Sequence, residues 1–221
     1  MKLNEQERIS EALLKHCQQW AQRVQPEALV CKLLGHKPVL VTSPALNREC
    51  GLITVNGAPR IYVRASLPPV RRRWALAYEL AKWWLTRASL KPEEASEAAL
   101  GIAASLLIPR TSFFRAQSVV GEKSAPLAEH FGVSESCLVL RESELTERPL
   151  ALVAPLTVRV RGAGFHWPEE KELRELAEKP RISGVKKARL KDDTRRVALW
   201  GTSAQAATRG RGAVQPVATT D

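Results

Sequence analysis

Paired cysteines and a long apolar run are both missing from this sequence. The four cysteines are far apart and form no C-x-x-C pair: Cys17, Cys31, Cys50 and Cys137. This spacing argues against a zinc ribbon and against a disulfide framework. We therefore interpret the cysteines as reduced thiols that serve mostly as small buried apolar residues.

A membrane-spanning segment is also missing. The longest apolar run, residues 150–158, contains Pro155 and is too short to cross a bilayer. The first ten residues are polar and do not resemble a secretory signal. With 44% hydrophobic and 26% charged residues, the composition is that of a soluble globular protein. We expect a cytoplasmic protein with no membrane partner.

The positive charge is unevenly distributed. The chain has a net charge of +11, and residues 181–211 hold nine Lys or Arg against only Asp192 and Asp193, an excess of seven positive charges. Such a cluster suits nucleic acid or an acidic partner. The alternative interpretation is a solvated and partly disordered basic tail.

Hydrophobic periodicity divides the first part of the chain into helices and a small sheet. Apolar spacing predicts helices over 4–24 and 26–34, the second ending at Gly35. Three short β-type runs follow at 39–41, 52–55 and 61–63, and Asn56-Gly57 predicts a hairpin between the last two. Beyond them, helices are expected over 70–85 and 92–107, with a further short helix from residue 111.

Residues 124–146 have the spacing of a helix-turn-helix. Gly132 permits a tight turn, and Ser134 is placed to cap the second helix. One interpretation is DNA binding through the second helix. The other is a hairpin that only packs, and we favour it because the second helix offers mainly acidic residues to a phosphate backbone.

The helix at 70–85 is the segment around which the chain is organised. Its middle reads Y-E-L-A-K, so Tyr78 and Lys82 lie four residues apart on one face with Glu79 beside them. That is the geometry of H-E-x-x-H, in which two histidines hold zinc and the glutamate is the general base. Both histidines are absent here.

Several segments occur in an order that resembles the ImmA/IrrE family of zinc metallo-endopeptidases. They read L-P-P-V-R-R-R-W-A-L-A-Y-E-L-A-K-W-W-L, then E-E-A-S-E-A-A-L-G-I-A-A-S-L-L-I-P, then L-A-E-H-F-G-V-S-E-S-C-L. The resemblance covers about residues 25–145. It implies a peptidase scaffold, and family members cleave helix-turn-helix repressors in bacterial damage responses and mobile elements.

Matching the family residue by residue puts its zinc ligands in doubt. Tyr78 and Lys82 stand at the two histidine positions, and Glu79 stands at the general-base position. The acidic third-ligand positions fall on Ser96 and Ala98, with Glu97 between them. A tyrosine must lose a proton with a pKa near 10 to bind zinc, and a protonated lysine repels a cation.

The ligand positions therefore predict that no metal is bound and that the general-base position is inactive. The four histidines are scattered through the sequence: His16, His36, His130 and His166. Our hypothesis is that Lys82 replaces the metal as a fixed positive charge, paired with Glu79 or with Glu94 or Glu97. The alternative is that Lys82 extends to solvent and Glu79 lies on a wet face.

Three functions follow from these observations. The first is a catalytically inactive regulatory module that binds a protein partner, a helix-turn-helix repressor, with an extended peptide lying beside the strand formed by Arg60, Ile61, Tyr62 and Val63. The second is an active zinc endopeptidase with atypical ligands that cleaves such a repressor. The third is a DNA-binding transcriptional regulator that uses residues 124–146 and 181–211.

The expected fold class is α+β. We expect a mainly helical, metallopeptidase-like domain over residues 1–148 that includes a three-stranded sheet and the helix-turn-helix-like hairpin at about 124–146. A small β-containing C-terminal extension over 149–200 and a disordered tail over 201–221 complete the prediction.

Overall fold

The computed structural model describes residues 2–19, 23–42, 49–88, 90–153, 158–161, 169–178, 185–190 and 197–201. The chain divides into two compact units, Met1–Arg141 and Glu142–Asp221. The division falls inside helix α7 (Glu135–Thr146), a few residues before the predicted boundary at 148. Each unit is described by itself.

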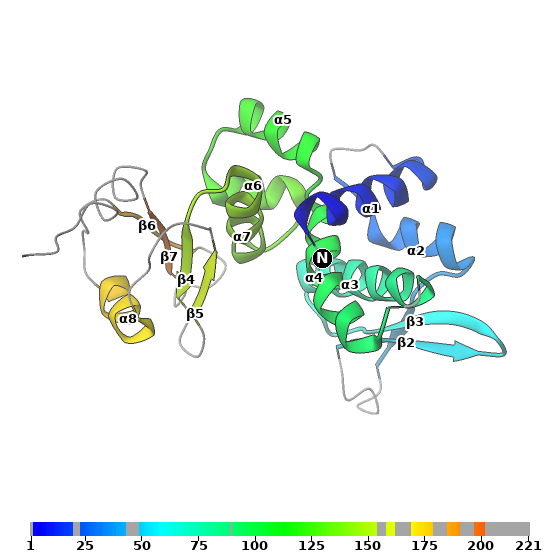
Figure 1. The fold of residues 1–221 in the computed structure, drawn as a ribbon. Helices are drawn as coiled ribbons and strands as arrows, with labels where there is room; N and C mark the ends of the chain where they lie inside the picture. Colours follow the sequence, from blue (N-terminus) through cyan, green and yellow to red (C-terminus); the bar gives the residue numbers. More distant parts are fainter. Residues whose placement is uncertain are drawn as a thin grey trace, which may run out of the picture. The chain divides into compact units, whose positions relative to one another are not determined.

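The first unit packs helices against one three-stranded sheet (Figure 1). Helices α1 (Leu3–His16) and α2 (Pro26–Leu34) precede strands β1 (Val39–Val41), β2 (Cys50–Val55) and β3 (Ala58–Arg64). Helices α3 (Pro69–Arg87), α4 (Pro92–Leu107), α5 (Arg110–Val120), α6 (Ser124–Phe131) and the start of α7 follow. The sheet order is β1-β3-β2, with β1 parallel and β2 antiparallel to β3.

The hairpin between β2 and β3 forms where the sequence predicts it. Asn56 and Gly57 both have positive φ, 50° and 77°. Two positive φ angles in a two-residue turn match the twist of the flanking strands, and Asn-Gly adopts them at little cost. The turn fixes the register, so that Leu52 lies opposite Ile61 and Cys50 lies opposite Val63.

The first helix is shorter than predicted. Helix α1 ends at His16 instead of near residue 24. Gln18 has a φ of 54°, which is left-handed and cannot continue a right-handed helix. Val24, the last apolar residue of the predicted helix, is only 1% exposed. It fitted the helical spacing because it is buried, although it lies outside the helix.

The core of this unit centres on α3 and α4. Leu76, Leu80 and Ala81 of α3 are at most 1% exposed. They pack in one cluster with the small α4 residues Ala95 and Ala99. Small side chains let two helix axes approach closely, which confirms that the alanine-rich helix serves as a packing partner for α3.

A buried ionic network joins α1, α4 and α7. The Arg141 guanidinium is fully buried and forms an ion pair with Glu7. Glu7 also accepts a hydrogen bond from the Ser105 hydroxyl at 3.2 Å, and Arg141 Nε donates to the Ile108 carbonyl at 3.2 Å. A buried ion pair is tolerated when further hydrogen bonds satisfy it, as they do here.

The predicted hairpin at 124–146 consists of α6 and α7. Gly132 between them is left-handed, with φ 64°, and the Ser134 hydroxyl accepts a hydrogen bond from the Cys137 amide at 3.2 Å. Both local features follow the sequence expectation. Every residue of α7 is buried or half-buried, so this helix presents no exposed side chain.

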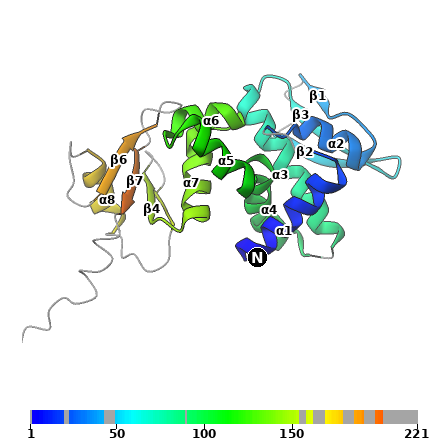
Figure 2. The same ribbon diagram turned by 90° about the horizontal axis from the view of Figure 1, so that it is seen from above.

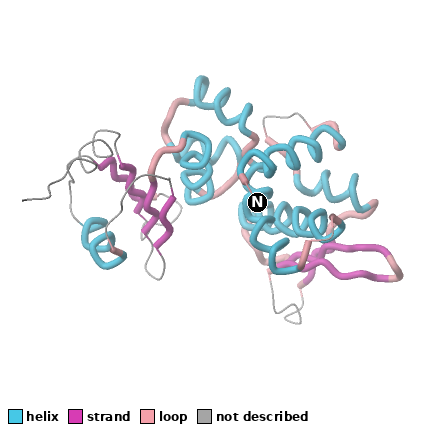
Figure 3. Tube along the Cα trace, in the orientation of Figure 1, coloured by secondary structure: helices cyan, strands magenta, loops and turns pink. Residues whose placement is uncertain are grey.

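The second unit contains a four-stranded antiparallel sheet. Its strands are β4 (Leu150–Val153), β5 (Val158–Arg161), β6 (Val185–Arg189) and β7 (Val197–Gly201), in the order β5-β4-β7-β6. Helix α8 (Glu170–Glu178) packs Leu173 and Ala177 on one face of this sheet (Figure 2). Figure 3 shows the strands of both sheets in magenta.

Strand β6 corrects the interpretation of the basic region. Residues 181–211 contain β6 and β7. The alternative of a disordered basic tail is therefore wrong for residues 185–189 and 197–201, whereas binding of nucleic acid or of an acidic partner by this region stays a prediction. Gly201, predicted to begin the tail, is the last residue of β7. The remainder of the predicted tail lies outside the described residues.

The fold class is confirmed as α+β and mainly helical. Among the described residues, no helix has the length and apolar character needed to span a membrane.

We predict that breaking the Glu7–Arg141 pair destabilises the protein strongly. Arg141→Met or Glu7→Gln should each lower the free energy of unfolding by about 3–5 kcal/mol, because the remaining charge stays buried without its partner. Urea unfolding followed by circular dichroism measures this.

Two controls accompany that measurement. Glu11→Gln changes an exposed charge on the same helix and should cost little. The double variant Glu7→Gln with Arg141→Met should lose less stability than the sum of the two single variants. Equal small losses for Arg141→Met and Glu11→Gln would contradict the role of the network.

Candidate functional site

Helix α3 places the glutamate of the Y-E-L-A-K motif inside the protein. Glu79 is only 5% exposed, so the alternative of a wet face for this carboxylate is wrong. A carboxylate needs a partner when it is removed from water. The side chain that lies beside it comes from the sheet.

The partner of Glu79 is the Cys50 thiol at the start of β2. Cys50 Sγ lies 3.7 Å from Glu79 Oε1 and 3.7 Å from the Ala75 carbonyl oxygen. The thiol has one proton, so it donates to one of these two oxygens at a time. Cys50 lies opposite Val63 of β3, which is fully buried, so its side chain points from the sheet toward α3.

This environment keeps the Cys50 thiol protonated. Burial, followed by the negative charge of Glu79, raises the pKa of Cys50 from 9.0 to about 12. Lys82 acts in the opposite direction but is a smaller influence. Since the pKa is higher in the folded protein, the stabilising contribution of the contact is present below pH 9 and is lost as the pH rises toward 12.

Among the described residues, the three degenerate ligand positions form no hydrogen bond or ion pair with Glu79. Tyr78 is half-buried and packs against the hydrophobic core, Lys82 is half-buried, and Glu97 of α4 is exposed. No ion pair joins Lys82 to Glu79, Glu94 or Glu97, all of which are described residues. The hypothesis of a paired, metal-replacing lysine is therefore corrected: a thiol partners Glu79 instead.

These donors do not fit a zinc ion. A catalytic zinc site needs three protein ligands and an open position for water. In the part of the chain that the structure describes, no group of three His, Cys, Asp or Glu side chains is placed to hold a metal. Of the scattered histidines, His130 stacks edge-on against Phe131, and His166 lies outside the described residues.

The sheet topology corrects the expected peptide-binding strand. Strand β3 is central: Tyr62 pairs with both Val39 and Gly51, and Val63 pairs with Leu40 and Cys50. An extended peptide cannot pair with a strand whose two sides are already occupied. Of the four residues predicted to hold a peptide, Arg60 and Ile61 lack a β1 partner. The edge strand next to Glu79 is β2.

Arg73 is a second buried charge on α3 that the sequence reasoning missed. It is 6% exposed, and its guanidinium donates to the carbonyls of Val24 (2.7 Å), Phe131 (3.2 Å) and Gly132 (3.1 Å) and to Gln25 Oε1 (3.3 Å). Burial lowers the pKa of Arg73. The carbonyls at the end of α6 carry partial negative charge, which favours this cation. Arg73 thus fixes α3 to the α1–α2 connection and to the α6–α7 turn.

Comparison with known proteins places this site in a family. Residues 39–143 match the model of the IrrE N-terminal-like domain. This part of the chain is similar to that family. The matched span runs from β1 into α7 and contains β2, β3 and α3, so the expected resemblance to the ImmA/IrrE peptidases is confirmed.

A solved structure shares the fold of the IrrE-like chain. The chain is similar to a Mycobacterium tuberculosis transcriptional regulator, with a TM-score of 0.65 and 16% sequence identity. The match covers 98% of this chain and 93% of the other. At this identity the likeness establishes the fold. No curated protein matches the sequence.

Sequence reasoning identified Glu79 but not Cys50. The signal was available in the strand pattern, because Cys50 and Leu52 alternate toward the same face as the apolar Ile61 and Val63. The sequence does not show which residue of β2 lies against α3, because that depends on where the helix crosses the sheet.

We predict that Cys50 is slow to react with thiol reagents and that Glu79 is a cause. Iodoacetamide labelling at pH 8, followed by mass spectrometry, should modify Cys50 more slowly than Cys31, because only the thiolate is nucleophilic. Glu79→Gln removes a negative charge and should speed labelling of Cys50 while leaving Cys31 unchanged. Equal rates at Cys50 in both proteins would show that Glu79 does not influence the thiol.

Proposed function

We propose that this chain is a catalytically inactive IrrE-like domain that binds a protein partner as a regulatory module. The partner class is a helix-turn-helix repressor. The observation that carries the proposal is the Cys50–Glu79 contact, because it gives the family's general base a thiol partner in place of a metal-bound water.

The chemistry of the site favours binding over cleavage. Peptide hydrolysis by this family requires a metal that lowers the pKa of water and polarises the carbonyl. Tyr78 and Lys82 are poor zinc ligands, and Glu97 is exposed on α4. A buried glutamate whose neighbour is a protonated thiol has no activated water to deprotonate.

Strand β2 is the part of the scaffold best suited to hold an extended segment of a partner. It is an edge strand in the sheet order β1-β3-β2, and its first residue contacts Glu79. An edge strand offers unpaired N–H and C=O groups, to which a peptide adds as a further strand. Ile53, in the middle of β2, is 49% exposed and offers apolar contact area.

The regulatory part of the proposal rests on relatives. Family members act on helix-turn-helix repressors, and the similar solved structure is named as a transcriptional regulator. The DNA-binding alternative has less support at residues 124–146, because no residue of α7 is exposed to a groove. The competing function is an active zinc endopeptidase. The zinc content of the purified protein distinguishes that function from binding without cleavage.

We predict that the purified full-length protein contains far less than one zinc per chain. Elemental analysis by mass spectrometry measures this directly. The variant Tyr78→His with Lys82→His restores two family ligands on one face of α3 and should increase the zinc content. Stoichiometric zinc in the unmodified protein, lost on Tyr78→Phe, would instead support the zinc endopeptidase with atypical ligands.

We predict that a bound repressor remains intact. In a panel of purified helix-turn-helix repressors, at least one should bind the chain in calorimetry without being cut, with or without chelator. Ile53→Lys should weaken that binding because it alters the β2 edge. Leu40→Lys is the matched control, since Leu40 is 55% exposed on the opposite edge strand β1. Chelator-sensitive cleavage would refute the proposal.

A further inference from the structure

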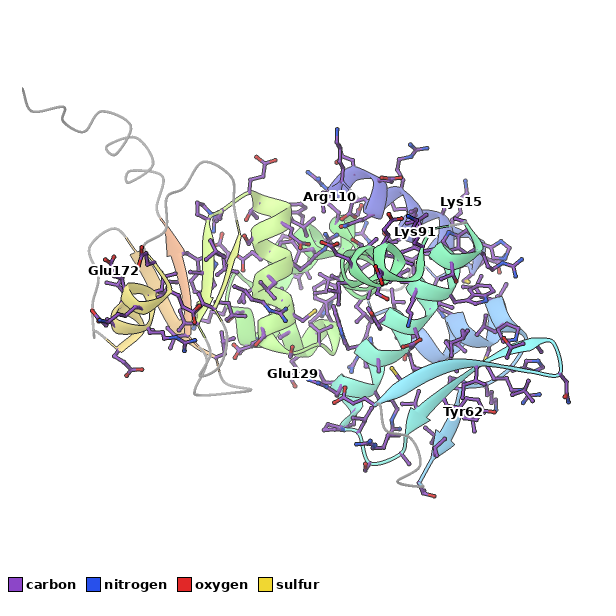
Figure 4. The ribbon with its side chains drawn as sticks, turned by 60° about the horizontal axis from the view of Figure 1, so that its bottom comes forward. Lys15, Tyr62, Lys91, Arg110, Glu129 and Glu172 are labelled. Carbon is purple, nitrogen blue, oxygen red and sulfur yellow. The ribbon has the colours of Figure 1, made fainter. Side chains whose placement is uncertain are left out.

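The sheet of the first unit has one face that no described helix covers. Strand β3 presents Ile61 and Val63 to the core, where they are 1% and 0% exposed, and α2 and α3 lie on that side. The residues that alternate with them on β3, Arg60, Tyr62 and Arg64, point to the opposite side of the sheet, which we call the outer face. Figure 4, which brings the bottom of the molecule forward, labels Tyr62 of β3.

The outer face combines an aromatic ring with two cations. Arg60, Tyr62 and Arg64 alternate along the central strand, and each is half-buried. Register places Ile53 beside Arg60, Val39 and Gly51 beside Tyr62, and Val41 beside Arg64. The cross-strand neighbours of Tyr62 are thus the aliphatic Val39 and the small Gly51.

The charge on this face is of one sign. Strands β1, β2 and β3 contain no Asp or Glu. The acidic neighbour Glu49 is bound by Arg71, whose Nε lies 2.9 Å and 3.0 Å from its two oxygens. Arg60 Nε is shielded from water and has no hydrogen-bond acceptor among the described residues.

We propose that the outer face binds single-stranded nucleic acid, with a base stacked on Tyr62 and phosphates held by Arg60 and Arg64. Arg60 and Arg64 are four residues apart on β3, or roughly 13 Å, which is about twice the separation of neighbouring phosphates on an extended single strand. A sheet that carries an aromatic residue between cations is a known platform for unpaired bases. Duplex DNA hides its base faces and would leave Tyr62 without a partner.

This inference is independent of the proposed repressor binding. It uses the face of the sheet, whereas an extended peptide would use the β2 edge. It also differs from DNA binding by residues 181–211, because its determinants lie in β3.

The test is fluorescence anisotropy of the full-length chain with fluorescein-labelled oligothymidylate at several salt concentrations. Tyr62→Leu keeps apolar bulk but removes the aromatic face, and should weaken binding at least about fivefold. Tyr62→Phe keeps the ring and should bind like the unmodified protein. Arg60→Gln should reduce the slope of log affinity against log salt by about 0.7.

Arg115→Gln is the charge-matched control, because Arg115 is exposed on α5, away from the sheet. It should leave the slope unchanged. Thermal unfolding of each variant shows that the fold persists, and the Arg60→Gln slope is a second readout if Tyr62→Leu is unstable. The proposal is overturned if the unmodified protein does not bind the oligonucleotide, or if Tyr62→Leu and Tyr62→Phe bind it with equal affinity. It is also overturned if Arg60→Gln and Arg115→Gln change the salt slope equally, or if a DNA duplex or polyglutamate binds more tightly than the single strand.

Discussion

The burial of α3 is the constraint on which the first unit depends. A helix that is surrounded by other elements must satisfy every polar group that it carries, since an unpaired buried charge costs several kcal/mol. Arg73 meets this demand with backbone carbonyls from two connections, and Glu79 meets it with the Cys50 thiol. The two charges lie six residues apart, and their partners fix how the α6–α7 turn and the sheet lie against the helix.

This constraint also explains how α3 can be held in place without metal ligands at Tyr78 and Lys82. In a zinc site the ion neutralises buried donors and joins several elements. Here the same helix is held by Arg73 and by the apolar contacts of α4, neither of which requires a metal. Tyr78 packs against the core and Lys82 is half-buried, so neither side chain needs a metal to be accommodated. Loss of the ligands is therefore compatible with retention of the fold.

Features of the fold that depend on local chemistry were predictable from sequence. The Asn56-Gly57 turn, the stop of α2 at Gly35 and the Ser134 cap each follow from the conformations that one or two residues favour. Features that depend on contacts between residues far apart in the sequence were not predictable in this way. The central position of β3 requires knowing that β1 pairs in parallel, and the Cys50–Glu79 contact joins residues 29 apart in sequence. Strand β6 was hidden by its basic composition, because the charge pattern outweighed the weaker strand signal of V-K-K-A-R.

The uncharged edges of the first sheet have a further consequence for the molecule in solution. Proteins usually protect edge strands with lysine, proline or a bulge, since an open edge recruits other chains into aggregates. Strands β1 and β2 read V-L-V and C-G-L-I-T-V, with neither charge nor proline, and they expose Leu40 and Ile53. The net charge of +11 supplies a general repulsion that opposes such self-association. High salt weakens that repulsion, so the colloidal stability of this protein depends on ionic strength more than its folding does.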